Sequence, residues 1–128
     1  MKLLLDTHAL LWWFTDDPRL SARARALIGD AGNEILVSAA SAWEIATKHR
    51  LGRLGEASDA VIRFEELVAA DGFTPLPISC RHGLRAGRYR AALRDPFDRM
   101  LAAQAEIECV PLVTLDSAFE QFDIATLW

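Results

Sequence analysis

The sequence has few of the residues that build disulfide or thiolate–metal scaffolds. Its two cysteines, Cys80 and Cys109, belong to no CxxC or Cys/His ligand spacing, so we expect reduced thiols with structural roles. Long apolar runs are missing as well: the longest near the start, Ala9 to Phe14, has six residues, against the roughly 20 of a membrane-spanning helix. No small-residue cleavage site follows the opening MKLLL. These absences predict a cytoplasmic protein without a membrane segment.

Positive charge is also scarce. Fourteen Lys and Arg stand against 18 Asp and Glu, which gives a formal net charge of −4. This balance opposes non-specific binding to a polyanion, so a function on nucleic acid would depend on a local basic patch and on metal ions. Apolar residues, in contrast, make up 52% of the chain, enough for the core of a single domain over residues 1–128.

Short apolar segments alternate with helical segments along the chain. The predicted strands are Lys2–Leu5, Glu34–Val37, Phe73–Ile78, Val110–Thr114 and Ile124–Trp128. The predicted helices are His8–Thr15, Ala22–Ile28, Ser41–Leu51, Asp59–Ala70, a segment from Arg81, Pro96–Glu106 with Asp95 as N-cap, and Ser117–Gln121. Pro75 and Pro77 place the third strand at a sheet edge. The alternation predicts an α/β fold, a three-layer α/β/α sandwich with a mostly parallel sheet.

Four acids stand at or just after the carboxyl ends of predicted strands, or in the first turn of a following helix: Asp6, Glu44, Asp98 and Asp116. Each has a structural explanation when taken singly. Asp6 and Asp116 are suited to N-caps, and Asp98 suits a helix N-terminus. Glu44 completes a capping box with Ser41 and an i,i+4 pair with Lys48.

Taken together, the four acids predict a metal site. The carboxyl ends of parallel strands meet at one edge of a sheet, so these acids would converge there. Carboxylates held close together repel one another unless cations neutralise them. Oxygen ligands without His or Cys at ligand spacing favour Mg²⁺, with Mn²⁺ as the alternative, and such ions orient phosphate and activate water.

Several motifs carry a resemblance to a known family. They are LLLDTHALLWW, SAASAWEIATKHRLGRL, DPFDRMLAAQA, PLVTLDSAF and the closing Leu127-Trp128. In order and spacing they resemble the PIN-domain proteins, specifically the VapC-like toxin ribonucleases of bacterial toxin–antitoxin pairs. The resemblance implies a homodimer, Mg²⁺-dependent cleavage of RNA by metal-activated water, and inhibition by a cognate antitoxin. It also places the metal-binding acids on Asp6, Glu44, Asp98 and Asp116, and a supporting hydroxyl on Thr114.

Other polar residues have two interpretations each. A stretch without acids carries Arg81, Arg85, Arg88, Arg90 and Arg94, either as a solvated helix face or as contacts to the RNA backbone. Arg99 would pair with an acid or touch phosphate, and Thr7 would bond a ligand or the backbone. Asp95 is most simply an N-cap, with an outer role at the site as the alternative. We expect the three histidines, His8, His49 and His82, to be structural or solvent-facing.

Two other functions deserve comparison with a ribonuclease. A catalytically silent relative that binds RNA or a partner would be expected to lack some of the acids, yet all four are present. A phospho-acceptor signalling domain would need paired acids after the first strand and a late Lys, and no Lys follows Lys48, so we reject it. Trp12, on the opposite side of its helix from Leu10, would be covered by the same chain, a second subunit or a partner.

Overall fold

A computed structural model describes residues 1–90 and 92–128. In chain order its elements are β1 (Lys2–Leu5), α1 (Thr7–Phe14), α2 (Ala22–Gly29), β2 (Glu34–Ser38), α3 (Ala39–Arg50), η1 (Gly55–Ser58), α4 (Asp59–Ile62), α5 (Phe64–Ala70), β3 (Thr74–Leu76), α6 (Cys80–Arg88), α7 (Pro96–Glu108), β4 (Leu112–Val113), η2 (Ser117–Gln121) and β5 (Thr126–Leu127). Among these helices, none has the length and apolar character needed to cross a membrane.

All five strands form one parallel sheet in the order β3-β2-β1-β4-β5. The predicted strands are therefore all found, although four of the five differ in their bounds, and β3 lies at an edge as Pro75 and Pro77 predicted. Because every strand runs the same way, the residues that follow β1, β2 and β4 emerge at one edge of the sheet.

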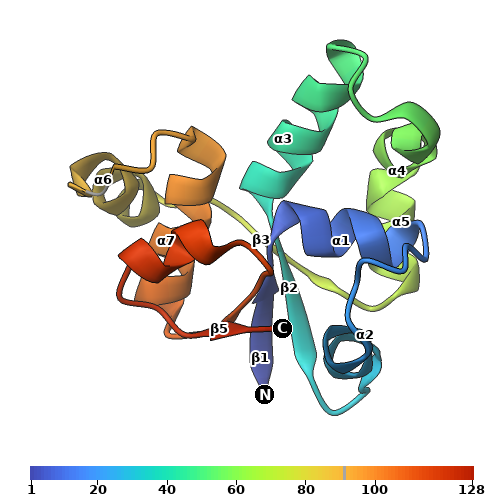
Figure 1. The fold of residues 1–128 in the computed structure, drawn as a ribbon, viewed down its shortest axis with the longest axis horizontal. Helices are drawn as coiled ribbons and strands as arrows, with labels where there is room; N and C mark the ends of the chain where they lie inside the picture. Colours follow the sequence, from blue (N-terminus) through green and yellow to red (C-terminus); the bar gives the residue numbers. More distant parts are fainter. Residues whose placement is uncertain (91) are drawn as a thin grey trace.

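Helices cover both faces of the sheet, which confirms the predicted α/β/α sandwich (Figure 1). Leu3 and Leu5 of β1 pack in a core with α1, α2 and α3, whereas Leu4 packs in a second core with α7. This alternation follows from the two-residue period of a strand. Figure 1 shows α6 and α7 on one side of the sheet and α1, α2, α4 and α5 on the other.

Two predicted helix boundaries are wrong. Helix α3 begins at Ala39, directly after β2, and its N-cap is Ser38, whose Oγ accepts from the Ala40 N–H at 3.0 Å. The capping box predicted for Ser41 and Glu44 therefore does not form, because both residues lie inside the helix. The helix predicted over 59–70 is divided into α4 and α5 at Arg63, whose backbone (φ −106°, ψ 19°) departs from helical geometry.

Trp12 is half-buried and is covered by its own chain. Its ring lies 5.8 Å from that of Trp128 in a T-shaped contact, and the Arg19 guanidinium stands 4.9 Å above it. The His8 ring lies 5.6 Å away on the same helix. The same chain thus supplies part of the cover, from the segment after β5 and the loop after α1, while cover by a second subunit or a partner stays a prediction.

Candidate active site

Asp98 lies within electrostatic range of the three other predicted acids, and the four together form what we call the acid site. Asp6 follows β1 at the N-cap position of α1, Asp116 follows Thr114 after β4, Glu44 lies on α3, and Asp98 lies in the first turn of α7. Burial, first, and then the charges of Asp95, Asp6, Glu44 and Asp116 together raise the pKa of Asp98 to about 7. A carboxyl group perturbed in this way is typical of functional sites.

Asp6 is almost completely enclosed. Its side chain is 4% exposed, and its Oδ2 accepts a hydrogen bond from Thr114 Oγ1 at 2.6 Å. Burial raises the pKa of Asp6 and the Glu44 charge adds to this, while the Thr114 hydrogen bond and His8 oppose it. Asp6 is thus a buried carboxyl group whose charged form depends on its neighbours.

Glu44 has one satisfied oxygen and one orphaned oxygen. Its Oε2 is 2.8 Å from Lys48 Nζ, which confirms the predicted i,i+4 pair. Its Oε1 is buried and, within residues 1–90 and 92–128, has no hydrogen-bond partner. An ionised oxygen left unpaired away from water is costly, so this atom points to a cation or another ligand as its partner.

Thr114 connects two of the acids. Besides donating to Asp6, its Oγ1 accepts from the Asp116 N–H at 3.0 Å. Asp116 itself is exposed, and its Oδ1 accepts from the Ala118 N–H at 2.9 Å, so it caps η2 as the sequence predicted. The hydroxyl predicted to support the last acid therefore supports the backbone of Asp116 and the carboxylate of Asp6.

Removing the Thr114 hydroxyl should move the pH dependence of any activity that needs ionised Asp6. This hydrogen bond lowers the pKa of Asp6, so Thr114→Val should raise that pKa and shift the acid limb of the pH–rate profile to higher pH. Activity should fall more at pH 6 than at pH 8. Thr126→Val, at an exposed position of β5, is the matched control. An unchanged acid limb would contradict a role for Thr114 through Asp6.

The acid site fits a hard divalent cation by its chemistry. Within the described residues, no three His, Cys, Asp or Glu side chains stand close enough together to hold a metal ion. Three of the acids direct one oxygen to a protein partner: Asp6 to Thr114, Glu44 to Lys48 and Asp116 to Ala118. The donor set nevertheless consists of carboxylates that repel one another, and no described residue partners Glu44 Oε1, as expected of Mg²⁺ or Mn²⁺ ligands.

Thr7 and Asp95 have structural partners. The buried Thr7 Oγ1 is 2.9 Å from Ser41 Oγ. This contact ties the start of α1, which Asp6 precedes, to α3, which carries Glu44. Ser41 was missed as a partner of Thr7, because its sequence pattern favoured a cap. Asp95 Oδ1 accepts from the N–H groups of Phe97 at 2.8 Å and Asp98 at 3.3 Å, which confirms the predicted N-cap.

The predicted RNA-binding arginines divide into two groups. Arg81 and Arg88 on α6, together with Arg90 and Arg94 after it, are exposed. Arg85 is exposed as well, but its Nη1 forms an ion pair with Glu106 Oε1 at 2.8 Å.

Arg99 is engaged by backbone carbonyl groups. Its guanidinium donates to the carbonyl oxygens of Ala86, Tyr89 and Leu93 at 3.0, 2.6 and 2.9 Å. Through these bonds Arg99 connects Ala86, Tyr89 and Leu93 to α7, while its two predicted roles, pairing with an acid and touching phosphate, stay predictions.

The histidines fit their predicted roles. His82 is buried and forms a capping box with Ser79, and its Nε2 lies 2.9 Å from Glu108 Oε1. His49 is exposed near the end of α3, and His8 is exposed between Trp12 and Asp6. Cys80 and Cys109 are both free thiols, as expected.

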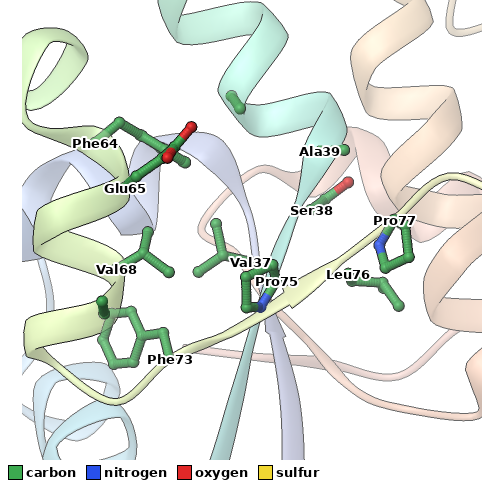
Figure 2. A pocket seen from close by; sticks show the side chains of 12 residues that line it. Val37, Ser38, Ala39, Phe64, Glu65, Val68, Phe73, Pro75, Leu76 and Pro77 are labelled. Atoms are coloured by element: carbon green, nitrogen blue, oxygen red, sulfur yellow. The ribbon is translucent and has the colours of Figure 1, made fainter.

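One large cavity lies away from the acid site. It measures about 650 Å³, is lined mostly by apolar side chains of α3, α5 and the β2–β3 edge, and has Val68 and Val37 facing each other across it (Figure 2). A smaller cavity of about 150 Å³ touches Asp6 and Asp116 beside Trp12 and Trp128. Neither Asp6 nor Asp98, the carboxyl groups with raised pKa values, lines this larger cavity, so we place the candidate active site at the acid site.

Part of the chain is similar in sequence to a known ribonuclease. The chain is 41% identical over 69 residues to Ribonuclease VapC16 of Mycobacterium tuberculosis, a segment that covers 51% of this chain and 49% of that protein. The chain therefore matches about half the length of this curated relative.

Solved structures share the fold at low identity. VapBC2 from Rickettsia felis, bound to a promoter DNA fragment, matches with a TM-score of 0.73 at 15% identity and covers 100% of this chain and 99% of its own. VapBC-1 from nontypeable Haemophilus influenzae gives 0.71 at 18% identity, with 99% and 97% covered. FitAcB from Neisseria gonorrhoeae gives 0.68 at 20%, with 98% and 96% covered.

The family itself is shown by a match over almost the whole sequence. The PIN domain family model matches residues 3–125, a range that contains all four acids of the acid site. The resemblance carried by the sequence motifs is thereby confirmed, and the chain belongs to the PIN domain family.

Proposed function

We propose that this protein is a Mg²⁺-dependent endoribonuclease that acts as the toxin of a toxin–antitoxin pair in the cytoplasm. The observation that carries the proposal is the acid site, where the buried Glu44 Oε1 lacks a partner in the part of the chain that the structure describes, and the pKa of Asp98 is raised by burial and by four neighbouring acids. The identity to Ribonuclease VapC16 supports RNA as the substrate. The VapBC and FitAcB folds support a protein antitoxin as a partner and motivate the expectation of a homodimer.

In this proposal each acid has a distinct part in holding the metal. The enclosed side chains of Asp6 and Glu44 and the half-buried Asp98 would bind Mg²⁺, or Mn²⁺ in its place, whereas the exposed Asp116 would act from the periphery. The bound ion would orient the phosphodiester and activate water for in-line attack. Thr114 holds the Asp6 carboxylate, Lys48 holds the Glu44 carboxylate, and Asp95 fixes the first turn of α7 that carries Asp98.

The test of this proposal is cleavage of RNA by the purified chain. Single-stranded RNA should be cleaved with Mg²⁺ or Mn²⁺, and the activity should disappear in excess chelator and return when the metal is restored. Undiminished cleavage in chelator would contradict the metal mechanism. RNA binding without cleavage under any divalent metal would instead favour the catalytically silent module.

The exposed arginines of α6 should contribute to RNA affinity. Arg81→Gln with Arg88→Gln should weaken binding and reduce the slope of log affinity against log salt by about 1, because fewer counterions are released. The cleavage rate of bound RNA should change less. Arg50→Gln with Arg53→Gln removes the same charge from exposed positions at the end of α3 and just beyond it. Equal salt slopes in both double variants would identify the α6 arginines as a solvated face.

A further inference from the structure

Trp43 is a large aromatic side chain left open to solvent beside the acid site. It is 61% exposed, although tryptophan is among the most costly side chains to leave in water. On α3 it immediately precedes Glu44, whose side chain is only 5% exposed. Neighbouring residues of a helix project about 100° apart around its axis. The indole of Trp43 therefore projects to one side of the Glu44 side chain.

Phe97 holds the indole from the facing helix. The two ring centroids are 4.7 Å apart with planes at 78°, a T-shaped contact between α3 and α7. Phe97 immediately precedes Asp98, just as Trp43 precedes Glu44. The aromatic pair therefore spans the same gap between the two helices across which Glu44 and Asp98 interact. Near-perpendicular planes leave at least one face of the indole uncovered by Phe97.

The charge balance leaves a need for non-ionic contacts to RNA. The chain carries a net charge of −4, and its acid site faces a polyanionic substrate. Two of the arginines predicted to bind RNA are already engaged, Arg85 by Glu106 and Arg99 by backbone carbonyls. Stacking of a base on an aromatic ring adds affinity without needing positive charge.

We propose that the Trp43 indole, braced by Phe97, is a stacking platform for one nucleobase of single-stranded RNA next to the phosphodiester at the acid site. This rests on the proposed ribonuclease function and narrows it, because a base within a duplex is stacked on its neighbours and cannot lie on the indole. Trp43 is in this view a substrate-positioning residue that sets which phosphodiester reaches Glu44 and Asp98.

The test compares variants of Trp43 on short single-stranded RNA. Trp43→Ala should raise KM about tenfold with a smaller change in kcat, whereas Trp43→Phe, which keeps a ring, should lie near the wild type. Ile62→Ala is the matched control, since Ile62 is 76% exposed on α4 and plays no part in the site. Thermal unfolding of each variant verifies that the fold is retained.

A second substitution, made in the RNA, separates stacking from a general structural effect. Single abasic nucleotides are placed in turn around the cleaved bond. At one of these positions the abasic RNA should bind the wild-type protein about tenfold more weakly than the intact RNA does. For Trp43→Ala the same abasic nucleotide should cause little further loss of affinity, because the two changes remove the same contact. An equal abasic penalty in both proteins, or an unchanged KM in Trp43→Ala, would overturn the platform.

The outcomes also distinguish this inference from the ribonuclease proposal. Fluorescence anisotropy with the same oligonucleotides reads the contact without cleavage, so Trp43-dependent binding by a chain that never cuts RNA would support the platform and contradict the nuclease. If Trp43→Ala changes the sedimentation of the protein but not its RNA affinity, the exposed indole belongs to a protein interface and the platform is wrong.

Discussion

Asp98→Asn should abolish most RNA cleavage while making the metal-free protein more stable. The substitution keeps the shape of the side chain but removes a charge that four neighbouring acids oppose. A metal ligand of lower charge binds more weakly, and we expect cleavage to fall by at least about 100-fold. Relief of the repulsion should raise the melting temperature measured in chelator. We expect the same two changes in Asp6→Asn, lower cleavage and a higher melting temperature in chelator, because burial and the Glu44 charge raise the pKa of Asp6.

A loss of cleavage together with a gain in metal-free stability distinguishes a metal ligand from an ordinary surface acid. Glu56→Gln removes one negative charge from an exposed site on η1 and should alter neither quantity. Asp116→Asn should reduce cleavage less, because the side chain is exposed and already caps η2. A cleavage rate near that of the wild type in Asp98→Asn or Asp6→Asn would show that the ligand assignment is wrong. Lower stability in Asp98→Asn, without metal, would show that its carboxyl group stabilises the first turn of α7 more than its acidic neighbours repel it.

Divalent metal should stabilise the fold strongly, and more so at higher pH. Without metal the folded protein holds a proton on Asp98 up to about pH 7, whereas the ordinary pKa is 3.8. The folded state then binds more protons than the unfolded state, so the free energy of unfolding should decrease as pH rises from about 4 to about 7. Mg²⁺ at about 100 times its Kd should add about 2.7 kcal/mol.

The measurement is thermal unfolding at pH 5, 6, 7 and 8, with Mg²⁺ and with chelator. The Mg²⁺-dependent increase in melting temperature should be small at pH 5, where protons compete for the carboxylates, and largest at pH 8. In Asp98→Asn the increase should be reduced at every pH. An increase that is independent of pH, or as large in Asp98→Asn as in the wild type, would place metal binding elsewhere on the protein.

Much of the fold could be predicted because its signals are local. The alternation of Leu3, Leu4 and Leu5 between two buried faces, and the prolines at the edge strand, follow from strand periodicity and proline chemistry. Asp95 and Pro96 marked the start of α7 for the same reason. The parallel topology then brought Asp6, Glu44, Asp98 and Asp116 within range of one another.

Two sets of contacts that local patterns did not predict join residues from different segments. Ser41 fitted a capping box on its own, but β2 continues directly into α3 and the hydroxyl meets Thr7, 34 residues away. Arg99 was predicted to pair with an acid or touch phosphate, and its guanidinium also meets the carbonyl oxygens of Ala86, Tyr89 and Leu93. No local pattern contains such information, since it arises only when the helices pack.

The pairing of Trp43 with Phe97 was missed for a related reason. Each residue is an ordinary apolar position in its own helix, and only the packing of α3 against α7 brings the two rings to 4.7 Å beside the acids. One signal was present in the sequence, because each aromatic residue directly precedes an acid predicted to bind metal. Two such acids converging at one site would bring their neighbours together as well.

The central claim is that the acid site binds the metal that cleaves RNA, and the dependence of cleavage rate on Mg²⁺ concentration tests it most directly. We predict saturation in the wild-type protein, and in Asp98→Asn a half-saturating concentration raised by at least about tenfold together with a lower maximal rate. Glu56→Gln should reproduce the wild-type curve. Identical curves for the wild type and Asp98→Asn, or cleavage that does not respond to Mg²⁺, would contradict the claim.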